Sequence, residues 1–345
     1  MHQKLVLVGF GNVARALVRL LLRKQQLLEN EYQLTFSFTG IATGHHGLAA
    51  NPAGIDVERA LALVEAGEAV SALSVAPLED AFAVMAASGA DVMFENSPVN
   101  HSTGQPALDH VRFALNRGMH AITANKGTVV HGYSELMSLA KSKGRKFLFE
   151  STVLGGSPVF SVFRECLPGA ELQSFRGVLN STTNIILSRM GRGETFDQAV
   201  SYCQSIGVAE TDPSADVDGW DAAIKVAALV TVLMDTPLAP QQVTRTGIRE
   251  ITPAMVANAK SAGRRYKLVC SAERRLDGVT AAVSPELTDV ADPLYGMEDS
   301  TTGVAFRTDV LGDYSIVESE RPGMVAGPEP TAYGLFADFI RAVRP

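Results

Sequence analysis

The sequence predicts an α/β protein with an N-terminal doubly wound parallel sheet, followed by an α+β domain. Short apolar runs, typical of buried parallel strands, alternate with helical patterns over the first half of the chain. This simple alternation stops after residue 151. We therefore expect a first domain of residues 1–150, with 326–345 packing back on it, and a second domain of residues 151–325. A chain of 345 residues can build two domains, each with its own core.

Composition and charge narrow the class of protein. The chain is 46% hydrophobic and 19% charged, with a net charge of −7, which argues against nucleic acid as a partner. No apolar run reaches the ~18 residues of a membrane-spanning helix, so no membrane partner is expected. The N-terminal apolar run leads into glycines and helically spaced arginines, unlike a signal peptide. Widely spaced Cys166, Cys203 and Cys270 predict buried free thiols and a reducing, cytoplasmic location.

The first predicted strand leads directly into a glycine turn. The run "KLVLVG" (4–9) is followed by "GFGNVA" and then by a helical pattern of about four turns. Gly9 permits a tight turn, Gly11 lets the backbone approach a pyrophosphate, and the helix N-terminus offers free N–H groups. This order predicts a Rossmann-type dinucleotide site, with a purely structural glycine turn as the alternative. The expected cofactor-binding residues here are Gly9, Phe10, Gly11, Asn12 and Val13.

The second predicted strand, residues 34–43, indicates which nicotinamide cofactor is bound. A site specific for NAD usually places an Asp or Glu after this strand, where it meets the adenosine ribose. This chain has Thr43, Gly44, His45 and His46 instead. Because no carboxylate would repel a 2′-phosphate, we expect NADP, with NAD as the alternative. Both histidines are equally compatible with a solvated loop.

Further strands and helices complete the first domain. We expect helices over 56–67, 77–89, 104–118 and 132–144, and strands over 90–97, 120–125 and 146–151. Ligands bind at the carboxyl ends of such parallel strands. Ser97 and Lys126 follow two of these strands, so both are predicted to meet the cofactor. A lysine beside a nicotinamide is suited to proton transfer or to oxygen polarisation, although a turn lysine is more often a surface residue.

The second half mixes strands and helices without simple alternation. We expect strands over 171–180, 266–273, 279–285 and 303–312, and helices over 182–190, 195–207 and 219–234. This pattern predicts a sheet covered on one face by helices. A final amphipathic helix over 330–343 is predicted to pack back on the first domain.

The stretch "DPSADVDGWDAAIK" (212–225) concentrates carboxylates before one lysine. Asp218 stands where a helix N-cap would be, and Asp221 and Lys225 are spaced i, i+4 on one helix face. Asp216 and Glu210 are expected in the loop before that face. A capped helix with one solvated ion pair would explain only part of this acidic cluster, so we expect a substrate site.

Several motifs together resemble the homoserine dehydrogenase family. They are "TANKG", "ESTVLGGSPV", "GVLNSTTNIIL", "AETDPSADVDGWDAAIK" and the tail "AGPEPTAYGLFADFIR", and the resemblance runs from residue 5 to 341. It implies NAD(P)-dependent interconversion of L-homoserine and L-aspartate 4-semialdehyde in threonine, methionine and isoleucine biosynthesis. It also implies a split nucleotide-binding domain, a middle region for substrate binding and dimerisation, and a homodimer.

The resemblance also implies roles for individual residues. Lys126 and Lys225 match the family's catalytic lysines, and which of them acts as acid and base stays open. Glu210, Asp216 and Asp221, together with Lys225, match its substrate-binding residues.

A monovalent cation such as sodium is often bound by the family's loop matching "ESTVLGGS". The corresponding ligands are the Glu150 side chain and the backbone carbonyls of Val153, Gly155 and Ser157.

The chain departs from the family pattern near its C-terminus. The motif "GMVAG" (323–327) keeps Gly323 and Gly327, but Val325 replaces a glycine. This loop lies near the nicotinamide in the family, so Gly327 is an expected cofactor contact. The chain ends at residue 345 without an added regulatory domain, so threonine feedback is not expected.

Two other functions compete with this interpretation. One is a related semialdehyde or dihydrodipicolinate-type reductase, although none of the three cysteines lies in a motif typical of a phosphorylating semialdehyde dehydrogenase. The other is a non-catalytic NADP-sensing protein, against which the retained lysines and carboxylates argue.

Overall fold

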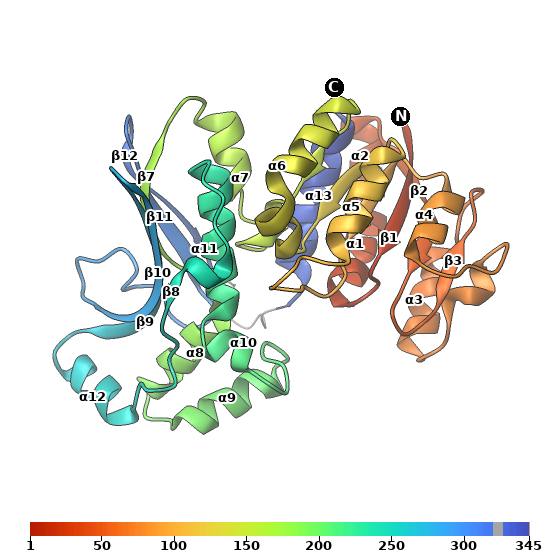
Figure 1. Ribbon diagram of the computed structural model, residues 1–345. Helices are drawn as coiled ribbons and strands as arrows, with labels where there is room; N and C mark the ends of the chain where they lie inside the picture. The colour runs from red at the N-terminus through yellow and green to blue at the C-terminus, as the bar shows by residue number, and fades with distance from the viewer. Residues whose placement is uncertain (320–326, 345) are drawn as a thin grey trace. The chain divides into compact units, whose positions relative to one another are not determined.

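The chain divides into two compact units in the computed structural model, which describes residues 1–319 and 327–344 (Figure 1). The first unit is Met1–Gly156 together with Pro328–Pro345, and the second is Ser157–Gly327. Within the described residues, no helix is both long and apolar enough to cross a lipid bilayer.

The first unit contains a six-stranded sheet in the order β3-β2-β1-β4-β5-β6. All neighbouring pairs are parallel except β2 with β3, so the predicted doubly wound parallel sheet is confirmed. The short antiparallel edge strand β3 was not expected from the sequence. The strands are β1 (His2–Val8), β2 (Thr35–Ala42), β3 (Leu48–Ala50), β4 (Val92–Glu95), β5 (His120–Thr123) and β6 (Phe147–Leu148).

Helices cover both faces of this sheet. Leu5 and Leu7 of β1 belong to a cluster with α1 and α13, whereas Val6 lies beside Val84 of α4, close to Gly40 on β2. Leu5 and Leu7 lie on one face of the sheet and Val6 on the other, because successive strand residues point to opposite sides. The helices are α1 (Asn12–Arg23), α2 (Gln25–Tyr32), α3 (Val57–Glu65), α4 (Ala81–Ser88), α5 (Ala107–Asn116), α6 (Lys126–Ser142) and α13 (Glu329–Val343), with 3₁₀ turns at Val70–Leu73 and Glu150–Thr152.

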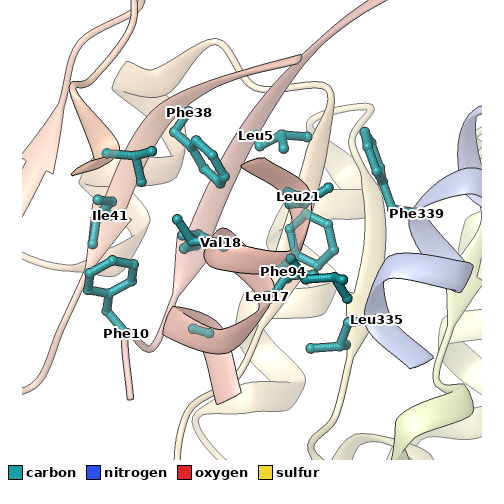
Figure 2. Close-up of a cluster of buried hydrophobic side chains, with 14 of the residues drawn as sticks. Leu5, Phe10, Leu17, Val18, Leu21, Phe38, Ile41, Phe94, Leu335 and Phe339 are labelled. Atoms are coloured by element: carbon teal, nitrogen blue, oxygen red, sulfur yellow. The ribbon is translucent and has the colours of Figure 1, made fainter. Parts of the chain in front are cut away.

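The core of the first unit joins the two ends of the chain. Figure 2 shows Leu335 and Phe339 of α13 beside Phe94 of β4 and Leu17 of α1. The rings of Phe339 and Phe94 meet edge to face with centroids 6.0 Å apart. The C-terminal helix therefore belongs to the first unit, although the chain between residues 157 and 327 forms the second.

The second unit contains a six-stranded sheet in the order β12-β11-β7-β9-β10-β8, antiparallel except where β8 pairs with β10. Helices α8 and α11 pack on β9, and the segment carrying Leu294 and Met297 packs on Val178 and Val269. The strands are β7 (Leu172–Val178), β8 (Thr244–Arg245), β9 (Arg265–Arg275), β10 (Gly278–Thr288), β11 (Thr302–Thr308) and β12 (Gly312–Glu318).

The predicted helices of the second unit are present, and one further helix follows them. The helices are α7 (Val159–Ser161), a π-helical turn (Val162–Cys166), α8 (Ser181–Met190), α9 (Phe196–Ser205), α10 (Ser214–Val217), α11 (Trp220–Leu233), a 3₁₀ turn (Pro240–Gln242) and α12 (Pro253–Ser261). The helices α10 and α12 and the strands β8 and β12 were not expected from the sequence. The expectation that every cysteine is buried is wrong for Cys166, because this residue is exposed on the π-helical turn.

Candidate functional site

The glycine turn lies between β1 and α1, as the sequence predicts. Gly9 has a φ of +87°, and a β-carbon there would lie 2.5 Å from the backbone of Asn96. Glycine is required at this position for both reasons. The same close approach places the turn against the Asn96–Ser97 backbone, at the carboxyl end of β4.

The rest of this turn divides between the core and the surface. Gly11 is the N-cap of α1, no side chain caps the helix, and a β-carbon at Gly11 would meet nothing within 4 Å. Asn12 is exposed and accepts a 2.7 Å hydrogen bond from Arg15. Phe10 is 4% exposed and Val13 packs against the same core, so Phe10 can face a cofactor only through its backbone.

The carboxyl ends of β4 and β5 are tied together by Asn125. Its amide donates hydrogen bonds to the carbonyl oxygens of Ser97 at 3.0 Å and Pro98 at 3.3 Å. Its side-chain oxygen accepts from the N–H of Gly127 at 3.0 Å and thereby caps α6. Lys126 is the first residue of α6, so this helix begins earlier than predicted and the lysine is not in a turn. One residue thus positions both Ser97 and Lys126.

A fully buried carboxylate lies beneath Ser97, and the sequence analysis missed it. Glu95 ends β4 at 0% exposure. Its Oε1 accepts hydrogen bonds from the hydroxyl and the backbone N–H of Ser97, and lies 3.3 Å from Nδ1 of His110. The strand predicted over 90–97 contains this residue, but a strand-terminal glutamate carries no sequence signal that it will be buried.

The loop that follows β2, which carries no carboxylate, is held together by hydrogen bonds of the Thr43 hydroxyl. This hydroxyl accepts a 2.6 Å hydrogen bond from the N–H of His46 and donates to the carbonyl of Gly47. His45 is exposed and His46 is half-buried. Both imidazoles therefore lie on a short, internally bonded loop next to the sheet edge.

In the second unit, the acidic stretch forms a hydrogen-bonded cluster. Nζ of Lys225 lies 2.9 Å from Oδ2 of Asp221 and donates to the carbonyl of Leu179 at 2.6 Å. Asn180 donates to Asp216 at 2.6 Å and to Asp221 at 3.0 Å. The i, i+4 contact predicted from the spacing is confirmed, and Asp216 joins it through Asn180.

The ion pair in this cluster is more buried than a typical surface ion pair. The side chains of Lys225 and Asp221 are 14% and 18% exposed. Burial raises the pKa of the Asp216 carboxyl above its usual value, and the charge of Asp221 raises that pKa further. Two neighbouring carboxylates therefore share one lysine and one amide, so a positively charged group that approached Asp216 would be bound favourably.

Asn180 is a site residue that the sequence analysis did not name. It is 4% exposed and is the N-cap of α8, where its Oδ1 accepts from the N–H of Thr183 at 2.8 Å. Asn before "STT" and an apolar run is a recognisable helix start. That signal predicts a cap, but only the packing of α8 beside α10 and α11 directs the amide to the carboxylates.

Two local predictions for this stretch need correction. Asp218 does not cap α11, because Gly219, with φ of +80°, is the N-cap, and the Asp218 carboxylate instead pairs with Arg249. Asp216 lies in the short helix α10 rather than in a loop. Glu210 does lie in the preceding loop and is exposed, and the described contacts do not bring its carboxylate into the cluster.

The predicted cation ligands are divided between the two units. Glu150 is 3% exposed and lies 3.3 Å from Arg341, which also contacts the buried Asp338. Val153 and Gly155 follow in the first unit, whereas Ser157 begins the second, where its carbonyl accepts from the N–H of Val159. No cluster of three or more His, Cys, Asp or Glu suited to a metal occurs within residues 1–319 and 327–344.

The C-terminal glycine motif is described only at its end. Gly327 is exposed and is the last residue of the second unit. Gly323, Val325 and the predicted boundary at 325–326 lie outside the described residues.

Comparisons with known proteins show which family this chain is similar to. Residues 158–340 match the family model described as homoserine dehydrogenase, and residues 9–150 match the one described as its NAD-binding domain. The chain belongs to the homoserine dehydrogenase family. It is 35% identical to a protein from Pseudomonas canavaninivorans named NAD(+)-dependent homoserine dehydrogenase, covering 98% of this chain and 95% of that protein.

Two further relatives extend this similarity. A homoserine dehydrogenase from Methanocaldococcus jannaschii is 32% identical and is covered over 97% of both chains. A crystal structure of a homoserine dehydrogenase from Thiobacillus denitrificans has a TM-score of 0.81 at 27% identity, covering 99% of this chain and 73% of that one.

The first unit has features that suit a nicotinamide dinucleotide. The N-terminus of α1 has no side-chain cap, and the space beside Gly11 is open. Both amide atoms of Asn96 are buried without a hydrogen-bond partner among the described residues. Because buried polar groups are normally paired, these atoms suit a polar ligand beside the glycine turn.

Proposed function

We propose that this chain interconverts L-homoserine and L-aspartate 4-semialdehyde with a nicotinamide cofactor, as a step of threonine, methionine and isoleucine biosynthesis. The single observation that carries the proposal is the cluster of Lys225, Asp221, Asn180 and Asp216, in a chain that also has a dinucleotide-type glycine turn. A substrate with an ammonium group and a hydroxyl group complements such a set of acids and a lysine.

Each polar residue of the cluster has a proposed role. Asp216 and Glu210 bind the substrate ammonium, and Asp221 orients Lys225 through their 2.9 Å contact. A substrate ammonium beside Asp216 would counter the effects that raise the pKa of this carboxyl. A bound nicotinamide cofactor would supply the hydride acceptor for oxidation of the alcohol carbon. Lys225 and Lys126 supply the proton transfer and the polarisation of the substrate oxygen.

The cofactor-binding residues are proposed from the first unit. Gly9, Gly11 and the N-terminus of α1 would bind the pyrophosphate, with the backbones of Phe10, Asn12 and Val13 lining the turn. Ser97, Lys126 and Gly327 are proposed to meet the nicotinamide end.

We propose NADP as the preferred cofactor, because the loop after β2 offers Thr43, His45 and His46 instead of a carboxylate. The name of the Pseudomonas relative specifies NAD(+), so the comparison of kcat/KM with the two cofactors is decisive. A higher kcat/KM with NADP supports the proposal, and a higher value with NAD refutes it.

We also propose that Glu150 and the carbonyls of Val153, Gly155 and Ser157 bind a monovalent cation such as sodium, since oxygen ligands suit a hard cation. Activity should fall when sodium is replaced by a bulky organic cation at constant ionic strength. Equal activity in both salts would remove this site from consideration.

A homodimer formed by the second unit is the proposed assembly. The sheet carries a groove of about 710 Å³ lined by both signs of charge, including Arg176, Glu273 and Arg307. Oppositely charged groups on one patch can pair across a twofold axis. The mass in solution, measured by light scattering, tests this, and a monomer at working concentration contradicts it.

The chemistry of the cysteines disfavours a phosphorylating semialdehyde dehydrogenase. Burial raises the pKa of Cys203 to about 11 and that of Cys270 to about 12, whereas a nucleophilic thiol needs a lowered pKa. A cytoplasmic location remains part of the proposal, on the grounds of its free thiols.

The test of the proposed function uses Lys225→Ala and Lys126→Ala. Each should lower kcat for L-homoserine oxidation by about 10² or more, with cofactor binding largely retained. Lys141→Ala, on the surface of α6, is the matched control. Near-wild-type turnover in both variants would refute the assignment, and cofactor binding without turnover in the wild type would favour a sensing protein.

A further inference from the structure

A pocket of about 270 Å³ lies within the second unit, away from the residues proposed for catalysis. The last turn of α8, helix α12, the start of β9 and the segment around Tyr295 and Glu298 form its walls. Its volume is near the lower end of small-molecule sites, which run from about 300 Å³ upwards. A ligand of only a few functional groups would fill it.

Positive charge dominates the lining of this pocket. Its walls carry Glu298 as their carboxylate, against five basic side chains. Two of the bases are already neutralised, since Arg265 pairs with Glu298 and Arg192 with Asp299. The complete basic set is Arg192, Lys260, Arg264, Arg265 and Lys267.

The other three bases donate to neutral oxygens. Lys260 donates to the carbonyl of Gly191 at 2.8 Å, and Arg264 donates to that of Leu287 at 3.2 Å. Lys267 donates to Oδ1 of Asn184 and to the carbonyl of Met297. A lysine has three donors and an arginine five, so Lys260 and Arg264 have donors left for a ligand.

Lys267 is buried, and a bound anion would offset the free-energy cost of burying its positive charge. It is 2% exposed, and burial lowers its pKa to about 8. Asn184, which faces it, also donates to the carbonyls of Asp299 and Thr301 and so fixes the wall opposite β9. Arg265 lies 4.3 Å over the ring of Tyr295, which holds its guanidinium in place. Lys267 and Arg265 are therefore held in place by groups of the protein itself.

We propose that this pocket binds a small multivalent anion that carries phosphate or carboxylate groups. Such an anion would accept hydrogen bonds from Lys260 and Arg264 and would neutralise the excess charge at Lys267. Arginine and lysine donors are the usual partners of these oxyanions.

The pocket lies at the other end of α8 from the acid–lysine cluster. Asn180 at the N-cap contacts Asp216 and Asp221, whereas Leu187, Ser188 and Gly191 line the pocket. Ten helical residues span about 15 Å, so an anion in this pocket does not occupy the proposed homoserine site. Its binding can be measured whether or not the chain is catalytically active.

The test measures binding of inorganic phosphate and of citrate to the full chain by isothermal titration calorimetry. The double variant Lys260→Gln, Arg264→Gln removes two exposed bases of the pocket and should keep the fold, which circular dichroism verifies. The control Arg164→Gln, Arg275→Gln removes the same charge from surface ion pairs elsewhere in the second unit.

We expect at least one anion to bind the wild type and the control, with affinity at least tenfold weaker in the pocket variant. Binding of phosphate alone identifies a phosphate-bearing ligand, and binding of citrate alone identifies a polycarboxylate. The proposal is overturned if the wild type binds neither anion, or if all three proteins bind them equally.

Discussion

Asn180 serves two purposes within a single side chain. Its Oδ1 caps α8, and its amide holds Asp216 and Asp221 in place. The donor therefore counters the repulsion between two neighbouring carboxylates, of which Asp216 has a pKa that burial has already raised.

Replacing Asn180 by Ala should therefore impair the proposed homoserine site more than it destabilises the fold. We expect about 1 kcal/mol of lost stability from the missing cap, and a loss of at least about tenfold in kcat/KM for homoserine, since hydrogen bonds to charged groups contribute about 1.5–3 kcal/mol. Steady-state kinetics and chemical denaturation measure the two effects.

The control is Thr195→Ala, which removes the N-cap of α9 outside the cluster. It should lose similar stability and keep kcat/KM. If the two variants had the same kinetics, Asn180 would have only a structural role.

The imidazole of His120 makes the stability of the first unit depend on pH. Burial, together with the nearby charges of Arg145 and Lys146, lowers its pKa to about 4, and its Nδ1 accepts from the N–H of Lys146 at 3.1 Å. Between pH 6.5 and 4, the unfolded chain thus binds a proton that the folded chain does not. Stability due to the neutral imidazole is present above pH 6.5 and is lost as the pH falls towards 4.

We expect His120→Asn to flatten this dependence, because an asparagine can accept the same hydrogen bond without titrating. The difference in slope is at most about 1.4 kcal/mol per pH unit. Urea denaturation at several pH values from 6.5 to 4 provides the measurement. Identical slopes for the wild type and the variant would contradict the assignment.

At the scale of single elements, the turn between β1 and α1 contains two glycines with different roles. Gly9 is required by the fold, and Gly11 leaves room for a ligand. Gly9 has a positive φ and lies against the Asn96 backbone, while Gly11 has a φ of −77° and open space beside it. One position is constrained by the fold, and the other is left free for a ligand.

Two alanine variants test this distinction. Gly9→Ala should lose about 2 kcal/mol or more, because it combines left-handed strain with a backbone clash. Gly11→Ala should keep its stability within about 0.5 kcal/mol and weaken cofactor binding. Denaturation and fluorescence titration with NADPH distinguish them; equal destabilisation by both changes would be inconsistent with the geometry.

At the scale of the whole molecule, α13 completes a domain that begins with β1. Phe339 is fully buried and meets Phe36 and Phe94 edge to face. The first unit therefore finishes its core only after the second unit has been synthesised. The C-terminal helix is therefore part of the core that covers the N-terminal sheet.

Phe339→Ala should lower the free energy of unfolding by about 3–5 kcal/mol, the usual effect of removing a buried aromatic ring. Tyr333→Ala, on the same helix but 55% exposed, should have a much smaller effect. Chemical denaturation followed by circular dichroism compares them. A loss below about 1 kcal/mol for Phe339→Ala would show that α13 is not part of the core.

Patterns close together in the sequence determined much of this protein. The glycine turn, the alternating strands and helices, and the Asp221–Lys225 contact follow from periods of 2 and 3.6 residues and from spacings of a few positions. The family resemblance rests on the same short motifs. One prediction from a local pattern was wrong. Asp218 is a good N-cap residue, but its carboxylate pairs instead with Arg249, which is distant in sequence.

Only the tertiary structure decided which distant residues meet. It brings Asn180 to Asp216 and Asp221, buries Glu95 beneath Ser97, and gathers bases from the turn after α8, from α12 and from β9 around one pocket. Such contacts depend on how helices and strands pack, and side-chain type and spacing leave that packing open. The sequence therefore determined most of the elements, the family and the Asp221–Lys225 pair, whereas packing determined which charged groups distant in sequence meet.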